Sequence, residues 1–272
     1  MLTDYHTHTS RCGHATGTMR EYVEKAITLG IDEIGLTDHL WLYFQDPSQR
    51  DSTFAMNERD FAAHYEEMIR TRTKYSDRIK VRISVEADYI AGREKELLSI
   101  LAQYDFDYVL GSVHFLDGWP LDAPESTSRY ARGPVSPIYR SYYQNLQGAI
   151  ALGAFDLLAH LDLPKKFGFR PEDDLSELVR NTLDLIAKHD LAVELSSAGL
   201  RKPVRETYPS SAILEQMNAL SIPIALSSDA HAPAEVGADY DRLIAAARAA
   251  GYEQSVTFEK RVRRTHNLPR EA

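Results

Sequence analysis

Three histidines near the start of the chain have the spacing of metal ligands. His6 and His8 lie two residues apart in the run 4–8. Residues two apart in an extended chain face the same side, so both imidazoles could reach one ion at about 2.0–2.1 Å from each nitrogen. His14 follows Gly13, in a loop that could fold back over the same site. Taken alone, the stretch also fits a histidine-rich surface loop.

The other histidines strengthen the metal interpretation. The chain holds ten histidines, and most of them fall at the ends of predicted strands or directly after them. With one strand glutamate and one Asp-x-His pair, the predicted metal ligands are His6, His8, His14, His39, Glu86, His114, His160, Asp229 and His231. Imidazole and carboxylate ligands suit zinc, iron and manganese. His64, His189 and His266 lie in predicted helices or in the tail, and we expect them at the surface.

Nine ligands are too many for one ion and fit three. Asp229 and His231 repeat the two-residue spacing of the first histidine pair. A strand glutamate such as Glu86 can bridge two ions about 3.5–4 Å apart, the separation used for in-line displacement at phosphorus. Other catalytic plans find less support, because no serine sits in a nucleophile elbow and no glycine-rich loop opens a helix in the phosphate-binding pattern. Cys12 shows no base partner and stays unassigned.

Predicted strands and helices alternate along the chain, a pattern typical of a parallel sheet covered by helices. We predict strands at 2–6, 33–37, 80–87, 108–113, 155–159, 191–195, 222–226 and 255–258. We predict helices at 19–29, 58–75, 92–103, 138–152, 175–188, 211–220 and 239–250. Two long loops, 40–56 and 115–137, interrupt this alternation.

Seven or eight such strands suggest a barrel closed on itself. The predicted ligands support a barrel, because chemistry collects at the C-terminal ends of the strands in that fold. His6, His39, Glu86, His114, His160 and Asp229 all fall at or near such ends. A doubly wound open sheet is the alternative, but it would not bring every strand end together.

Composition sets the broad class of protein. The chain has 272 residues, a net charge of −9 and no long basic run, which argues against nucleic acid as the main partner. We expect one domain over 1–272, with 260–272 as a frayed tail. The single cysteine suits a reducing compartment. No apolar run approaches the roughly 20 residues of a membrane span, and no signal peptide is visible. We expect a cytoplasmic protein without a membrane partner; its oligomeric state stays open.

Four short motifs resemble those of the polymerase-and-histidinol-phosphatase (PHP) family. They are DYHTH at 4–8, TDH at 37–39, GSVH at 111–114 and SDAH at 228–231. The similarity extends from Leu2 to about Phe258, and the order and spacing of the motifs match as well. The resemblance implies an α/β fold, a distorted, TIM-like (β/α)7 barrel with a trinuclear metal site at the C-terminal ends of the strands.

The resemblance also implies how the ligands divide among three divalent transition-metal ions. The three groups would be His6, His8, Glu86 and Asp229; Glu86, His114 and His160; and His14, His39 and His231. Four stretches, 11–15, 114–119, 159–167 and 196–202, resemble the monofunctional histidinol-phosphate phosphatases of the family, and the chain shows no polymerase domain. The implied reaction is hydrolysis of L-histidinol phosphate to L-histidinol and phosphate, in histidine biosynthesis.

Such a reaction assigns roles to particular side chains. Arg201 and Lys202 follow the predicted strand 191–195 and could bind the phosphoryl oxygens, although both also fit a solvated loop. The predicted catalytic residues are Glu86, Asp229 and His231. Glu86 would bridge two ions, and coordination would lower the pKa of water enough to supply a nucleophile near neutral pH. Asp229 and His231 could pass a proton to the leaving alcohol, although a metal-bound group is a poor free acid.

Two other functions stay open at this point. A PHP phosphoesterase acting on nucleotides or DNA ends would need a basic groove, and the acidic balance of the chain weighs against one. A non-catalytic metal-binding protein is expected to have lost part of the ligand set, which this sequence retains.

Overall fold

Short parallel strands form the centre of the molecule. The computed structural model describes residues 1–269, and its strands pair in the orders β1-β2-β3 and β10-β9-β8-β5-β4. Every neighbouring pair within these two sheets is parallel. The strands are β1 (Thr3–Asp4), β2 (Glu33–Leu36), β3 (Lys80–Ile83), β4 (Glu86–Asp88), β5 (Leu110–Ser112), β8 (Leu157–Leu158), β9 (Ala192–Ser196) and β10 (Ile224–Ser227).

The two sheets meet at both of their edges. On one side, the Tyr5 amide donates a hydrogen bond to Leu226 O at 3.0 Å, and an isolated bridge joins Thr7 to Ala230. On the other side, an isolated bridge joins His39 to Glu86. The strands therefore enclose a TIM-like α/β barrel, as predicted, with short bridges in place of a continuous ladder at the two junctions.

One predicted strand is divided between the two sheets. Residues 80–87 were expected as a single strand, but β3 pairs with β2 and β4 pairs with β5. The change of partner occurs at Ser84 and Val85: the Ser84 amide donates to Leu36 O, and Val85 O accepts from the Leu110 amide. This change of pairing partner interrupts the regular barrel, and it places Glu86 at the junction of the two sheets.

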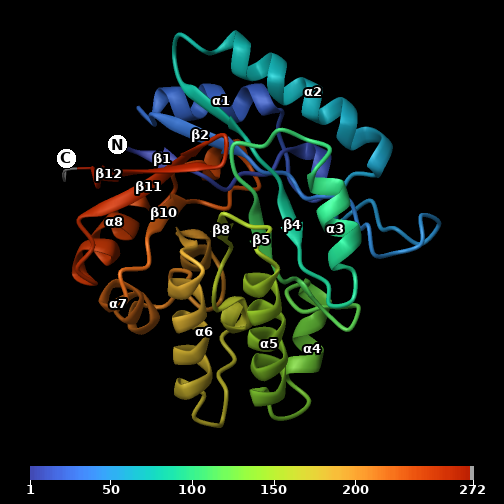
Figure 1. Ribbon diagram of the computed structural model, residues 1–272, viewed down its shortest axis with the longest axis vertical. Helices are drawn as coiled ribbons and strands as arrows, with labels where there is room; N and C mark the ends of the chain where they lie inside the picture. Colours follow the sequence, from blue (N-terminus) through green and yellow to red (C-terminus); the bar gives the residue numbers. More distant parts are fainter. Residues whose placement is uncertain (270–272) are drawn as a thin grey trace.

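Helices surround the strands on the outside (Figure 1). They are α1 (Met19–Thr28), α2 (Glu58–Lys74), α3 (Glu94–Leu101), α4 (Thr127–Tyr130), α5 (Ser136–Leu152), α6 (Ser176–Lys188), α7 (Ser211–Ala219) and α8 (Tyr240–Ala249). Thr18 and Glu21 form a capping box at the start of α1, and Asn57 caps α2. These caps agree with the predicted helix starts. Within residues 1–269, no helix combines the length and hydropathy that a bilayer span requires.

The second long loop contains regular structure that was not predicted. Residues 115–137 include the hairpin of β6 (Phe115–Leu116) and β7 (Trp119–Pro120), the short helix α4 and the first two residues of α5. Asp117 and Gly118 join the two strands with positive φ angles of 52° and 79°. An Asp-Gly pair at the turn is a strong hairpin signal, because both central positions require φ above zero.

The C-terminal segment is a hairpin and not a frayed tail. Strand β11 (Gln254–Glu259) pairs with β12 (Val262–Asn267), so the prediction of fraying from residue 260 is wrong for the described part of the tail; 270–272 lie outside it. Val256 and Phe258 are buried in a cluster with Tyr5, Tyr108 and residues of β5, β8, β9 and β10. Burial of these apolar side chains anchors β11. The charged strand β12 is ordered by its pairing with β11 and not by burial of its own side chains.

Candidate metal centre

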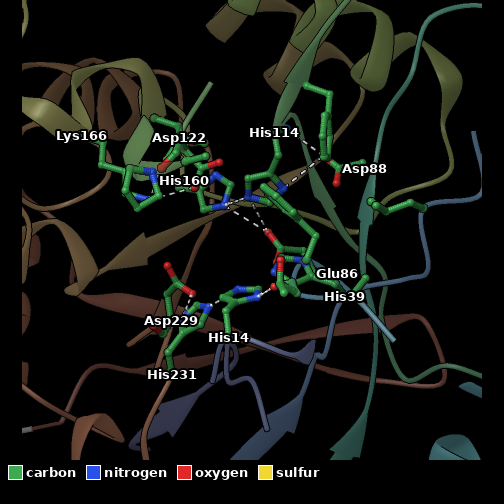
Figure 2. A pocket seen from close by; sticks show the side chains of 18 of the residues that line it. His14, His39, Glu86, Asp88, His114, Asp122, His160, Lys166, Asp229 and His231 are labelled. Atoms are coloured by element: carbon green, nitrogen blue, oxygen red, sulfur yellow. Dashed lines mark hydrogen bonds and ion pairs between the residues drawn. The ribbon is translucent and has the colours of Figure 1, made fainter. Parts of the chain in front are cut away.

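The nine predicted ligands converge on one cavity at the C-terminal ends of the strands. Parallel strands enter the barrel from the same side, so the residues that follow them meet at one end. The cavity has a volume of ≈ 410 Å³. Its wall includes His14, His39, Glu86, His114, His160, Asp229 and His231 (Figure 2). His6 and His8 are fully buried and lie against Glu86 and Asp229.

The Glu86 carboxylate lies at the centre of the histidines. Its Oε2 is 3.2 Å from His6 Nε2, 3.4 Å from His8 Nε2 and 3.0 Å from His39 Nδ1. Its Oε1 is 3.1 Å from His160 Nε2 and 3.6 Å from His114 Nε2. Each oxygen therefore faces a separate group of imidazoles, which is the arrangement of a carboxylate that bridges two ions.

Asp229 adds a second carboxylate on the far side of the first group. Its Oδ1 is 3.6 Å from His6 Nε2, 3.4 Å from His8 Nε2 and 3.4 Å from His231 Nδ1. The residue has a φ of 48°, in the left-handed region that aspartate tolerates better than most residues. This backbone turn directly follows β10 and sets Asp229 beside the histidines of the first motif.

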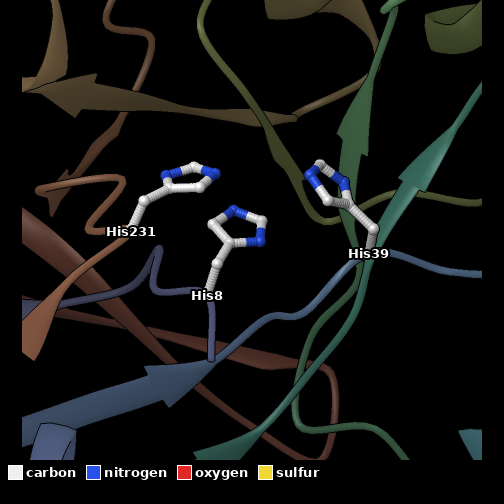
Figure 3. A group of neighbouring side chains, drawn as sticks. All are labelled: His8, His39 and His231. Carbon is white, nitrogen blue, oxygen red and sulfur yellow. The ribbon is translucent and has the colours of Figure 1, made fainter. Parts of the chain in front are cut away.

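Two pairs of histidine ring nitrogens lie so close together that, if both nitrogens of a pair were unprotonated, their lone pairs would repel each other. His114 Nε2 is 3.1 Å from His160 Nε2, and His14 Nε2 is 3.1 Å from His231 Nε2. Two nitrogens on one tetrahedral ion, at about 2.0–2.1 Å each, stand roughly 3.3 Å apart. His8 also approaches His39 and His231 with ring centroids 4.4 Å away in each case (Figure 3).

Several of these donor atoms are buried without a partner. His6 Nε2, both ring nitrogens of His8 and Glu86 Oε2 have no hydrogen bond to any residue within 1–269. Leaving a buried polar group unpaired costs about 1–3 kcal/mol. Divalent transition ions would satisfy all of these atoms at once, and the mixture of imidazole and carboxylate matches their preference. The residues present therefore fit a metal centre.

Opposing effects set the protonation of the central residues. Burial disfavours charge on Glu86, but His6, His39 and His114 outweigh it and hold the Glu86 pKa well below its usual range. Burial lowers the pKa of His8 far below its usual value, and His231 and His39 add to the effect. These effects favour an ionised Glu86 and a neutral His8, the forms that bind cations. Burial also disfavours charge on His6 and His114, but neighbouring carboxylates act in the opposite direction and raise the pKa of both, so a bound cation would have to displace a proton from these rings.

Two carboxylates that the sequence reasoning missed support the ligands from behind. Glu194 on β9 is fully buried, and its Oε2 lies 2.8 Å from His6 Nδ1. Its Oε1 accepts a hydrogen bond from the His160 amide at 2.7 Å. Asp88 Oδ1 lies 3.1 Å from His114 Nδ1. The available signal for Glu194 was an acidic residue inside an otherwise apolar strand.

We expect Glu194→Gln to weaken metal binding by about 10–100-fold, the usual cost of losing a carboxylate behind a metal-ligating histidine. The amide cannot replace the carboxylate, because in either orientation its NH₂ group opposes the ring N–H of His6 or the backbone N–H of His160. Competition with a chromophoric zinc chelator measures the affinity. The exposed Glu253 supplies the control, since Glu253→Gln should leave the affinity unchanged. Equal affinities for the wild type and Glu194→Gln would contradict the supporting role.

The two predicted phosphate-binding residues occupy different positions. Lys202 lines the cavity. The Arg201 guanidinium points to the Asp229 loop instead: Nη2 donates to Ser228 O at 2.6 Å, and Nε is 3.8 Å from Glu235 Oε1. Lys166, which the sequence reasoning did not single out, also lines the cavity and pairs with Asp122 at 2.9 Å. Two lysines thus offer positive charge at the cavity wall.

His64 is not at the surface, as the sequence reasoning expected. Its side chain is fully buried, and Nε2 lies 3.0 Å from Asp38 Oδ2. Phe61, His64 and Met68 share the spacing i, i+3, i+7, which places all three on the buried face of α2. His189 is exposed, as expected, whereas His266 is half-buried in the C-terminal hairpin.

Comparison with known sequences adds an independent finding. The PHP domain family matches residues 4–198. A protein of Deinococcus radiodurans named probable histidinol-phosphatase is 38% identical over 260 residues, which cover 96% of this chain and 97% of that protein. The histidinol-phosphatase of Bacillus subtilis is 29% identical over 263 residues, covering 89% of this chain and 97% of that protein.

Comparison with solved structures supports the same fold. The histidinol phosphate phosphatase of Lactococcus lactis aligns with a TM-score of 0.81 at 21% identity, covering 97% of this chain and 98% of that one. That crystal structure holds zinc, L-histidinol and phosphate. A Listeria monocytogenes protein named putative histidinol phosphatase aligns with a TM-score of 0.77 at 28% identity, covering 88% of this chain and 99% of that one.

Proposed function

The chain belongs to the PHP domain family, and on that premise we propose that it is a metal-dependent phosphatase that hydrolyses L-histidinol phosphate to L-histidinol and phosphate. The observation that carries the proposal is the Glu86 carboxylate, whose two oxygens face separate groups of imidazoles in the cavity. The near full-length similarity to histidinol-phosphatases supports the choice of substrate. The reaction belongs to histidine biosynthesis, and the single cysteine suits a cytoplasmic location.

We propose that the centre holds three divalent ions, of zinc, iron or manganese. The proposed ligand groups are His6, His8, Glu86 and Asp229; Glu86, His114 and His160; and His14, His39 and His231. When bound, such ions lower the pKa of water and neutralise charge on phosphoryl oxygens. Glu86 would fix the spacing of two sites, because one rigid carboxylate supplies both.

The remaining groups of the cavity would bind and orient the substrate. Lys202 and Lys166 offer positive charge for the phosphoryl oxygens. Phe54 and Phe115 form part of the cavity wall and offer an apolar surface to the ring of the leaving alcohol. Asp229 and His231 stand at the cavity edge, where a proton could pass to the leaving oxygen. No basic groove is needed for a substrate of this size, and nucleic acid is not part of the proposal.

A phosphate-release screen tests the substrate assignment. The purified metal-loaded protein is offered L-histidinol phosphate and a panel of phosphomonoesters that includes O-phosphoserine, nucleoside monophosphates and p-nitrophenyl phosphate. We expect kcat/KM for histidinol phosphate to exceed all others. Faster release from nucleotides would favour the alternative phosphoesterase activity, and no release from any ester would favour a non-catalytic metal-binding protein.

Arg201→Ala is expected to lower kcat/KM by about 10²–10³, the usual cost of removing one preorganised donor to a developing charge. The expectation requires the guanidinium to leave Ser228 O and reach a phosphoryl oxygen across the 228–231 turn. Arg201→Lys should recover only part of the loss, because lysine cannot donate two parallel hydrogen bonds. Steady-state kinetics and metal analysis are measured together. Lost metal would instead assign Arg201 to support of the Asp229 loop, and a normal rate with normal metal content would leave it only its hydrogen bond to Ser228 O.

A further inference from the structure

Two imidazoles of the centre have a carboxylate behind them, and a third imidazole has one nearby. Glu194 contacts His6 Nδ1 at 2.8 Å, and Asp88 contacts His114 Nδ1 at 3.1 Å. His8 lacks any such hydrogen bond within 1–269, although both of its ring nitrogens are buried. A ring nitrogen of His8, a carboxylate oxygen of Asp38 and Cys12 Sγ lie within 4.8 Å of one another. Asp38 therefore stands near His8 as Glu194 stands near His6 and Asp88 near His114, although no hydrogen bond joins Asp38 to His8.

Asp38 is itself held by a chain of contacts that crosses the barrel wall. Its side chain is fully buried. Oδ1 accepts hydrogen bonds from the Thr9 amide at 2.7 Å and from Thr9 Oγ1 at 3.1 Å. Oδ2 is 3.0 Å from Thr9 Oγ1, which can donate to it, and 3.0 Å from His64 Nε2 on helix α2. The chain of contacts joins a covering helix to the loop after β2 and to the loop after β1, which carries His8 and His14.

We propose that His64 is a positioning residue of the metal centre: through Asp38 it fixes the loop of Thr9 and the orientation of His8. The inference rests on the proposed metal centre and assigns a role to a residue outside the cavity. A buried carboxylate is stable only with hydrogen bonds and a compensating charge. Thr9 Oγ1 lies within hydrogen-bonding distance of both Asp38 oxygens, so without His64 the carboxylate would stay tied to the Thr9 loop but would lose its contact with α2, and the two could then shift together.

The geometry separates this role from simple core packing. Phe61 and Met68 lie on the same buried face of α2, and their side chains contribute apolar contacts to the core. His64 contributes a polar contact at that face, directed at Asp38, which in turn holds Thr9 in the loop that bears His8 and His14. A packing defect in α2 should therefore lower stability without a specific effect on metal affinity, whereas loss of the His64–Asp38 contact should affect metal affinity.

The test compares His64→Leu, His64→Gln and Met68→Ala in the metal-loaded protein. We measure zinc affinity by competition with a chromophoric chelator, the absorption spectrum of the cobalt-substituted protein, and the thermal midpoint. His64→Leu is expected to weaken zinc binding by about tenfold or more, in the range seen for residues behind metal ligands, and to change the cobalt spectrum. His64→Gln retains a donor near the position of Nε2 and should recover most of the affinity.

Met68→Ala and His189→Leu are the matched controls, since Met68 is buried on the same helix and His189 is exposed at the end of α6. Met68→Ala should lower the thermal midpoint while zinc affinity and the cobalt spectrum stay as in the wild type. The inference is overturned if His64→Leu binds zinc as the wild type does, or if Met68→Ala loses as much affinity as His64→Leu. A wild-type protein that binds no zinc would instead overturn the proposed function.

Discussion

Removal of the metal ions is expected to abolish turnover while most of the barrel stays folded. The proposed reaction depends on ions for its nucleophile and for charge neutralisation, and their loss removes several kcal/mol of transition-state stabilisation. Each 1.4 kcal/mol, roughly, is a factor of ten in rate, so the rate should fall by at least about 10³. The fold should persist because its apolar cores, such as the Tyr5, Tyr108 and Phe258 cluster, do not contain the ligands.

The measurement combines dialysis against a strong chelator with metal analysis, far-ultraviolet circular dichroism and phosphate release. More than one equivalent of transition metal should accompany the purified protein, and adding zinc, manganese or iron back should restore the rate. A general unfolding effect is separated from a catalytic one by the circular dichroism spectrum. Full activity in the metal-stripped protein would show that the proposed mechanism is wrong.

Glu86→Gln is expected to lower kcat/KM by about 10³ or more and to remove more than one ion. One carboxylate oxygen faces His6, His8 and His39, and the other faces His160 and His114. The substitution keeps the shape of the side chain but removes its charge and turns one acceptor into an NH₂ donor. Two sites should therefore weaken together. The loss of several kcal/mol of stabilisation corresponds to about 10³ in rate.

Metal content per chain and steady-state kinetics are measured on the same preparation of Glu86→Gln. Glu215→Gln is the control, because Glu215 is exposed on α7, and it should retain the full metal content and rate. The loss of a single ion from Glu86→Gln would argue against the bridging role while leaving Glu86 a simple ligand. Unchanged metal content and rate would exclude Glu86 from the centre altogether.

The positions of the candidate ligands could be predicted because strand geometry is a local property. The two-residue spacing of His6 and His8 predicts both imidazoles on one face. Asp229 and His231 share that spacing, but the left-handed φ of 48° at Asp229 means that a turn, and not strand geometry, directs their side chains. In a parallel barrel, residues that follow the strands meet at one end. The cavity brings these residues together with Glu86, while their roles as metal ligands stay predictions.

Some features were missed although a local signal was present. The Asp117–Gly118 pair marks the β6–β7 hairpin, because both positions need positive φ, yet it lay inside a segment that looked like a loop. The helical spacing of Phe61, His64 and Met68 likewise marked a buried face of α2. His64 was expected at the surface because histidine is polar, but its position on the apolar face of the helix indicated burial.

The sequence by itself determined the alternation of strands and helices, the class of fold and the set of residues at the strand ends. Only the tertiary structure decided which charged groups stand behind them. Glu194 lies 188 residues from His6, and no spacing rule relates the two. They meet because the closure of the barrel sets β10 beside β1 and the strand order sets β9 beside β10, so that β9 lies one strand away from β1. Local spacing sets the face on which a side chain lies, whereas its partner depends on which distant strand or helix the fold places there.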